Sequence, residues 1–281
     1  MHRSSPDTVD LTGSSDCEIV STTPAPKAKA KKKQSRKAQL LKSLYRERAI
    51  NLGAAPGTAR FSVARLQTLF PDAVLCNAST QLFSSTVMDC SYACGYRNCQ
   101  MILSSILADP ESAKRLEIST VPTVRELQEL LESAWSKGFD RDGAEQLGHR
   151  VVNTRKWIGT TEIYCILARL GIRSHIVDFH RPTGADNSHA ALFSWISQHC
   201  GQSKYPLYLQ HQGHSRTVVG VESAAGSLLV FDPDIDAGSE TPNAFRYTLE
   251  MTKKHRQFQV LYVDVHDAAD IPKDIGSVRV P

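Results

Sequence analysis

Apolar residues recur every three or four positions in the first half of the chain beyond residue 60. This is the spacing of helices that pack one face against a core. The pattern predicts four helices, near 64–70, directly after Cys94, at 123–137 and at 159–170. Thr123, at the start of the third, is a residue type that caps helix N-termini. We therefore expect this half of the chain to be helical.

Short runs of β-branched and aromatic residues replace that spacing in the second half and predict strands. The runs are 173–179, 206–212, 215–222, 227–231 and 257–265, with a further helix at 189–199 between the first two. Helices followed by strands are typical of the α+β class. We expect an N-terminal helical half packed on a largely antiparallel sheet.

Segments of different composition flank this body. Residues 1–34 are rich in Ser, Thr, Pro, Ala and Lys and are expected to be a disordered tail. Residues 35–50 have the pattern of a basic amphipathic helix. The folded body is expected to span 60–267, and residues 268–281 to form a C-terminal tail.

Composition narrows the class of protein further. The chain has 281 residues, 41% of them apolar, with no run of about 18 apolar residues and no secretory signal pattern. Seven cysteines without paired spacing fit a reducing compartment better than a disulfide framework. Cys90, Cys94 and Cys99 lack the CxxC pairs and the nearby histidine of a tetrahedral zinc site. We expect an intracellular protein without a metal or an organic cofactor.

The net charge of +4 is unevenly distributed. Residues 27–48 carry ten Lys or Arg and one acid, Glu47, so this segment has a charge of +9 and the rest of the chain −5. A mildly acidic body suits a basic protein substrate better than nucleic acid. The run Lys27–Lys33 is typical of a nuclear localisation signal, with a nucleic-acid tether or a solvated tail as alternatives. We expect a location in the nucleus and cytoplasm, no membrane association and no nucleic-acid binding by the folded domain.

A short β-prone segment, Val9, Asp10, Leu11 and Thr12, is followed by two serines and an acid. It resembles a SUMO-interaction motif, in which an extended peptide adds a strand to the edge of a sheet. Motifs of this length also arise by chance. SUMO is therefore a candidate partner, and a tail without function is the alternative.

Cys94 is the candidate nucleophile of the chain. Residues 89–95 form a small polar turn that runs into the apolar helix pattern, so Cys94 is expected at or just before the first helical turn. Backbone N–H groups and the positive end of the helix dipole lower the pKa of a thiol there and favour the nucleophilic thiolate. The alternative is a buried small apolar side chain. Cys90 precedes the turn and Cys99 lies inside the helix, so both suit the role less.

A thiol nucleophile needs a base and an acid that orients it, and the strands offer both. His214 stands at the start of the strand 215–222, and Asp232 follows the strand 227–231. If the two strands form a hairpin, His214 and Asp232 are neighbours. The order Cys, His, Asp, with the cysteine on a helix and the others on a sheet, indicates a papain-like fold. A loop histidine and a turn-forming aspartate are the alternatives.

Several longer segments are similar to the C78 cysteine peptidases, in particular to the branch of the zinc-finger-containing ubiquitin peptidases. They are DCSYACGYRNCQMILSSIL, GFDRDGAEQL, RKWIGTTEIYCILARLGIRSHIVDFHRPTG, PLYLQHQGHSRTVVGVE and LLVFDP, within residues 89–233. The resemblance implies that Cys94 is the nucleophile, His214 the base and Asp232 its orienting acid. It also implies cleavage of polyubiquitin, with a preference for lysine-sixty-three-linked chains. The zinc-finger patterns of longer members are absent from these 281 residues.

A second branch of the family, which cleaves the ubiquitin-fold modifier, is the nearest alternative. That branch has the motif Asp-Pro-His, in which the histidine follows the aspartate by two residues, whereas this chain has Asp232-Pro233-Asp234. The base must then come from elsewhere, and His214 in the GHS motif is what the ubiquitin branch uses. A SUMO protease and a non-catalytic ubiquitin-binding adaptor are further alternatives, and the complete Cys, His, Asp set argues against the adaptor.

The C-terminal tail of ubiquitin, Leu-Arg-Leu-Arg-Gly-Gly, requires a narrow channel for its glycines and carboxylates for its arginines. Asp140 and Glu162 occupy positions at which the resembling branch carries acids that contact the tail. Trp157 and Gly159 are candidates for the channel walls. The structural alternatives are a helix or turn cap for Asp140, a first-turn acid for Glu162 and core packing for Trp157.

Gln81 lies thirteen residues before Cys94. Cysteine peptidases stabilise the oxyanion with backbone and side-chain N–H donors. The N–H of Cys94 and the side chain of Gln81 are the candidate donors here.

Overall fold

The computed structural model describes residues 61–236, 238–239, 241–265 and 270–280, which belong to the compact unit Ala54–Pro281. The tail 1–34, the amphipathic helix 35–50 and the SUMO-interaction motif lie outside the described residues. Within the described part, no helix is both long enough and apolar enough to cross a membrane.

The longer helices form where the apolar spacing predicts them. They are α2 (Val63–Leu69), α3 (Cys94–Leu107), α5 (Val124–Ser136), α7 (Thr160–Arg169) and α8 (Ala190–Cys200). α5 begins with a capping box, in which Thr123 and Glu126 each accept a hydrogen bond from the other's backbone N–H. The short helices were not predicted, because four to six residues show no periodicity: α4 (Pro110–Ala113), α6 (Arg141–Gln146) and α9 (Leu249–Thr252).

The strands join in one eight-stranded sheet with the order β6-β5-β4-β3-β7-β2-β8, and β1 pairs with β4 beside this path. All pairs are antiparallel except β2 with β8. The strands are β1 (Val74–Leu75), β2 (Arg173–Phe179), β3 (Leu207–His211), β4 (His214–Glu222), β5 (Ser227–Phe231), β6 (Arg246–Thr248), β7 (Phe258–Asp264) and β8 (Ser277–Val280).

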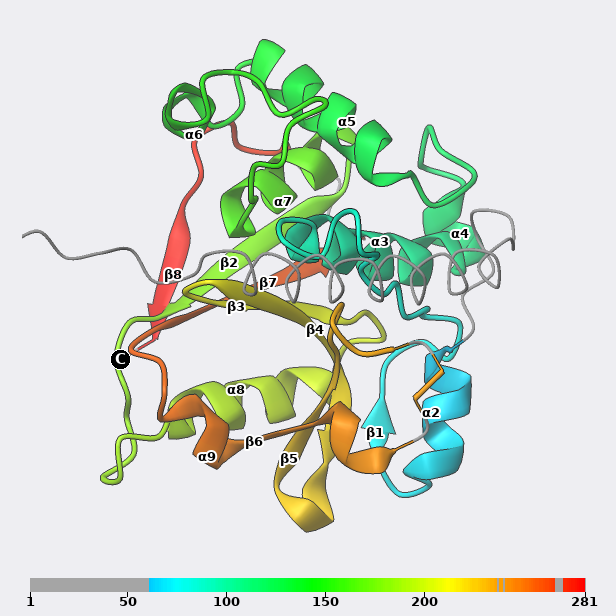
Figure 1. The fold of residues 1–281 in the computed structure, drawn as a ribbon, viewed down its shortest axis with the longest axis vertical. Coiled ribbons are helices and arrows are strands. Elements are labelled where there is room, and N and C mark those ends of the chain that lie inside the picture. Colours follow the sequence, from blue (N-terminus) through cyan, green and yellow to red (C-terminus); the bar gives the residue numbers. More distant parts are fainter. Residues whose placement is uncertain (1–60, 237, 240, 266–269, 281) are drawn as a thin grey trace, which may run out of the picture. The chain divides into compact units, whose positions relative to one another are not determined.

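Helices cover both faces of the sheet, with α3, α5 and α7 on one face and α8 on the other (Figure 1). The alternation along β3 shows the division, because Tyr208 packs in the core with α3 and α7 whereas Leu207 and Leu209 pack in the core with α8. α3 is buried along most of its length. The expected α+β class, helices on a largely antiparallel sheet, is confirmed, and α3 packs against β4 through buried hydrogen bonds.

The C-terminal end differs from the sequence expectation. Residues 268–281 were expected to form a tail, but Ser277–Val280 adds to the edge of the sheet as β8, parallel to β2. The Ser277 hydroxyl also donates a hydrogen bond to Asp178 in β2. Four largely exposed residues carry too little apolar signal to be recognised as a strand. The shorter β1 and β6 were missed because two or three residues show no alternation.

Candidate active site

Cys94 is the first residue of α3, as the sequence analysis expected. The preceding turn is fixed by Asp89, which accepts a hydrogen bond from the backbone N–H of Thr86 and forms an ion pair with Arg97. The thiol is half-buried and lies where the helix dipole is most positive. The two competing cysteines are placed differently, because Cys90 is exposed and Cys99 is fully buried, which raises the pKa of its thiol.

His214 and Asp232 are neighbours across the β4–β5 hairpin. The register pairs Thr217 with Phe231, so the start of β4 lies beside the end of β5. The Nε2 atom of His214 lies 2.8 Å from Oδ1 of Asp232. Since Nε2 is occupied, Nδ1 is the ring nitrogen left for the thiol.

The electrostatics of the three groups favour a thiolate–imidazolium pair. Burial alone raises the pKa of Cys94, but the polar side chains of His214 and Ser215 beside it outweigh this effect, and the net pKa is lowered. Burial alone lowers the pKa of His214, but hydrogen bonding to Asp232 and Cys94 raises it to about 9. Burial of Asp232 is likewise outweighed by His214 and Arg216, which lower its pKa. The arrangement can therefore supply an ionised nucleophile and a protonated base at neutral pH.

Arg216 holds the second oxygen of Asp232. Its Nε lies 2.7 Å from Oδ2, and its guanidinium stands over the ring of Tyr247. One terminal NH₂ group donates to Nε2 of His211, at 2.9 Å. Burial lowers the pKa of His211 to about 4, so its ring is neutral at pH 7 and accepts this bond. The carboxylate of Asp232 is thus fixed on both sides.

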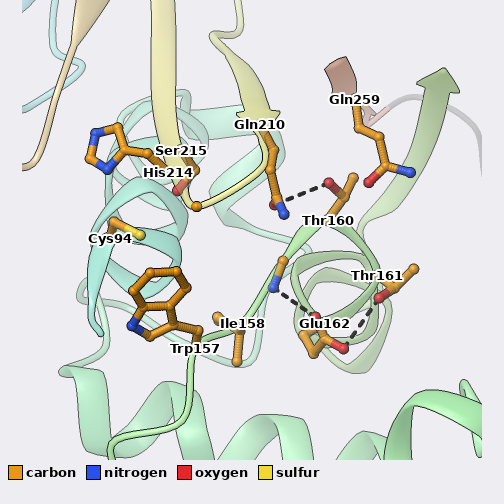
Figure 2. Close-up of a pocket in the computed structure, with 12 residues that line it drawn as sticks. Cys94, Trp157, Ile158, Thr160, Thr161, Glu162, Gln210, His214, Ser215 and Gln259 are labelled. Carbon is orange, nitrogen blue, oxygen red and sulfur yellow. Dashed lines mark hydrogen bonds between the residues drawn. The ribbon is translucent and has the colours of Figure 1, made fainter. Parts of the chain in front are cut away.

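A pocket of about 280 Å³ opens beside the thiol. Figure 2 shows Cys94, Trp157 and His214 on one side of it and Thr161, Glu162 and Gln259 on the other. Its lining residues are Cys94, Trp157, Ile158, Gly159, Thr160, Thr161, Glu162, Gln210, Gly213, His214, Ser215 and Gln259. The pocket therefore contains the nucleophile and base candidates and three of the four predicted substrate-binding residues.

The segment 157–159 forms the wall beside Cys94. Trp157 is 54% exposed, so core packing does not explain it, and its indole N–H donates to the carbonyl of Ser91. A Cβ atom on Gly159 would lie 2.9 Å from Nε2 of Gln210. A Cβ atom on Gly95 would lie only 2.6 Å from the carbonyl oxygen of Ile158. Two glycines therefore allow the wall to approach both α3 and β3 closely.

Glu162 has a structural role as well as a place in the pocket. Its Oε2 accepts a hydrogen bond from the N–H of Gly159, and Oε1 accepts one from the Thr161 hydroxyl. Burial raises its pKa, the hydrogen bonds oppose the rise, and the charge of Asp140 adds to it. The first-turn acid alternative thus describes one role of Glu162, and the same residue also lines the pocket.

Asp140 does not line the pocket. It is the N-cap of α6 in a left-handed conformation with φ +45°, and its Oδ1 accepts from the N–H of Gly143. Its Oδ2 is buried without a hydrogen-bond partner among the described residues. Asp140 is close enough to Glu162 for its charge to raise the pKa of that pocket residue.

Gln81 is not among the residues that line the pocket. Its backbone forms a bridge to Ser62, and its N–H donates to the hydroxyl of Ser104.

Gln210 was missed by sequence reasoning although it lines the pocket. Its Oε1 accepts from Tyr208 and Thr160, so its Nε2 remains as a donor. The available signal in the sequence was the polar side chain of Gln210 within the predicted strand 206–212.

Comparison with known proteins relates residues 71–262 to the model of peptidase family C78. Zinc finger-containing ubiquitin peptidase 1 of Macaca fascicularis is 38% identical over 207 residues, which are 65% of this chain and 36% of that protein. The protein of the same name in Homo sapiens is 37% identical over 207 residues, again 65% and 36%. The chain thus spans about a third of the length of these relatives.

A shorter relative and a solved structure are also similar. Ubiquitin carboxyl-terminal hydrolase mug105 of Schizosaccharomyces pombe is 39% identical over 158 residues, which are 54% of this chain and 64% of that protein. The crystal structure of UfSP from C. elegans covers 72% of this chain and 35% of that one, at 18% identity with a TM-score of 0.47.

Proposed function

This chain belongs to peptidase family C78, and from that premise we propose that it is a cysteine-type deubiquitinase. The proposed reaction is hydrolysis of the isopeptide bond after the terminal glycine of ubiquitin. The observation that carries the proposal is the placement of Cys94, at the start of α3, against the hydrogen-bonded pair of His214 and Asp232 beside a pocket.

Each group has a defined task in the proposed reaction. The Cys94 thiolate attacks the carbonyl carbon of the terminal glycine, and the oxyanion forms next to the free N–H groups of the first turn of α3. The imidazolium of His214 gives its proton to the departing lysine amine, which leaves a thioester on Cys94. His214 then takes a proton from water and the resulting hydroxide attacks the thioester. The C–S bond breaks, which releases the C-terminal acid of ubiquitin and leaves the Cys94 thiolate beside the imidazolium again. Asp232 keeps the imidazole oriented throughout.

Ubiquitin is favoured over the ubiquitin-fold modifier by the position of the base. At position 234, where the other branch has a histidine, this chain has an aspartate, which cannot act as the imidazole base. His214, by contrast, contacts Asp232 directly. Two similar proteins carry ubiquitin peptidase or ubiquitin hydrolase in their names. The preference for lysine-sixty-three-linked chains is proposed on the resemblance to their branch.

The tail of ubiquitin fits the chemistry around the pocket. Gly159 and Trp157 line the pocket, and a side chain at position 159 would collide with Gln210, so the main chain of Gly159 faces the site where two glycines are proposed to lie. Glu162, which lines the pocket, offers a carboxylate to the preceding arginines, and the nearby Asp140 is proposed to attract them with its charge. Roles for Lys27–Lys33 in nuclear import and for residues 9–12 in SUMO recruitment remain proposals on residues outside the described part.

Covalent probes test the proposed specificity. Ubiquitin, SUMO and the ubiquitin-fold modifier, each with a C-terminal propargyl group, are incubated with the full chain, and adducts are located by peptide mass spectrometry. We expect the ubiquitin probe alone to label Cys94, and lysine-sixty-three-linked tetraubiquitin to be cut fastest in a panel of linkages. Labelling by the ubiquitin-fold modifier instead would assign the chain to the other branch, and no labelling would favour the adaptor.

The tail-binding acids are tested with isosteric amides. Glu162→Gln keeps the acceptor for the N–H of Gly159, and Asp140→Asn keeps a good N-cap that tolerates positive φ. Each is expected to raise KM for a ubiquitin substrate about tenfold, because a buried arginine–carboxylate pair loses its charge, with little change in melting temperature. A substrate whose tail arginines are replaced by leucine should bind the variants and the wild type alike. Equal KM values with the natural tail would contradict these roles.

A further inference from the structure

Asn98 connects the nucleophile's helix to the base's strand. It lies one turn after Cys94 in α3 and is fully buried. Its Nδ2 donates to the carbonyl of Cys94, at 2.8 Å, and to the hydroxyl of Ser215, at 3.0 Å. Its Oδ1 accepts a hydrogen bond of 2.7 Å from the hydroxyl of Thr217. One side chain thus bonds two alternate residues of β4 and fixes the register of α3 against it.

The orientation of the Asn98 amide follows from its partners. The carbonyl of Cys94 can only accept, so it faces the amide N–H₂ group. The Oδ1 atom then faces Thr217, whose hydroxyl proton is used in that bond. The amide therefore acts as a donor toward Ser215, and the oxygen of Ser215 acts as the acceptor.

The proton of the Ser215 hydroxyl is consequently free for another acceptor. Ser215 is 2% exposed, and both Ser215 and Cys94 line the pocket, as Figure 2 shows. The neighbouring acceptors are the sulfur of Cys94 and the phenol oxygen of Tyr208, which already donates its own proton to Gln210. Tyr208 is neutral, since burial raises its pKa, and a charged thiolate is the stronger acceptor.

We propose that the Ser215 hydroxyl donates a hydrogen bond to the Cys94 thiolate, and that Asn98 is the positioning residue that orients this hydroxyl from α3. Ser215 touches the reacting sulfur, so it assists catalysis directly, whereas Asn98 acts through Ser215. The inference rests on the proposed function only in taking Cys94 as the nucleophile. His214 and Tyr208 are the titratable groups beside the sulfur, with Asp232 and Arg216 behind His214.

The test measures the thiol itself, without a ubiquitin substrate. Alkylation of Cys94 by iodoacetamide is followed by peptide mass spectrometry from pH 4 to 10 in the wild type and in Ser215→Ala. We expect the Ser215→Ala profile to shift to higher pH, with alkylation on its acidic limb slowed about tenfold, because a charge-assisted hydrogen bond to the thiolate is lost.

Ser105→Ala is the matched control. It removes a fully buried hydroxyl from α3, the helix that carries Cys94. That hydroxyl has no hydrogen-bond partner among the described residues. We expect its alkylation profile to match the wild type. A Ser215→Ala profile that also matches the wild type, in a protein that melts at the wild-type temperature, would overturn the proposal.

Thr217→Val tests whether Asn98 positions the Ser215 hydroxyl, and it replaces Ser215→Ala as the test if Ser215→Ala does not fold. It keeps the shape of the side chain but removes the hydroxyl that anchors Asn98. We expect a shift in the same direction of about two- to threefold, since the amide is loosened rather than lost. Ser215→Thr, which restores a hydroxyl, should return the profile toward the wild type. Because these readouts do not require ubiquitin, failure of the probe labelling and failure of this inference are separate results.

Discussion

Cys94→Ala is expected to lower the rate of ubiquitin-substrate hydrolysis by at least about 10⁴-fold, and to abolish labelling by a ubiquitin probe. The reason is chemical, because no other group at the pocket can form the thioester and the remaining binding interactions accelerate hydrolysis only weakly. The fold should be unaffected, since alanine suits the first turn of a helix and the thiol is only half-buried. Single-turnover hydrolysis and a melting curve on the same sample measure both effects.

Cys90→Ala is the matched control for this variant. Cys90 lies four residues earlier, is exposed and belongs to the turn that precedes α3. It should retain the wild-type rate within about twofold. If activity survived in Cys94→Ala and disappeared in Cys90→Ala, the assignment of the nucleophile would be wrong.

His214→Ala is expected to lower kcat about 10³-fold, because proton transfer to the leaving amine and stabilisation of the thiolate are lost together. Hydrogen bonding to His214 is one of the interactions that lower the pKa of Cys94, so its removal shifts alkylation of the thiol to higher pH. The wild type should itself lose activity above about pH 9, where the imidazolium gives up its proton. Activity and alkylation profiles recorded over the same pH range provide the measurement.

His211→Ala distinguishes loss of the base from a general disturbance of the hairpin. His211 belongs to β3, contacts Arg216 rather than the thiol, and is neutral at pH 7. It should change kcat by much less than His214→Ala. Equal losses in the two variants would indicate damage to the strands instead of the loss of a proton-transfer group.

The long elements could be predicted because their local patterns agree with their surroundings. The apolar residues Met101, Ile102 and Leu103 of α3 are buried in the core, and so are Ile176, Val177 and Phe179 of β2. β1, β6 and β8 escaped prediction because a strand of two to four residues is defined by its partner rather than by its own composition.

The candidate site divides in the same way. Cys94, His214 and Asp232 could be selected because each stands at the end of a recognisable element, and the hairpin that joins the last two was visible in the sequence. Asn98 and Ser215 could not, because their hydrogen bond joins residues 117 positions apart. Asp140 could be selected from the sequence, but its role could not, because an aspartate that caps a helix and an aspartate that binds a ligand are the same residue type.

The close approach of the Ile158 carbonyl to Gly95 limits how the pocket can be altered. A side chain at position 95 would collide with the main chain of Ile158, so this position cannot be varied without moving the backbone. The side chain of Trp157, by contrast, borders the pocket and is largely exposed, so it can be exchanged. Redesign of the site for another substrate is therefore expected to tolerate changes at position 157 and to fail at position 95.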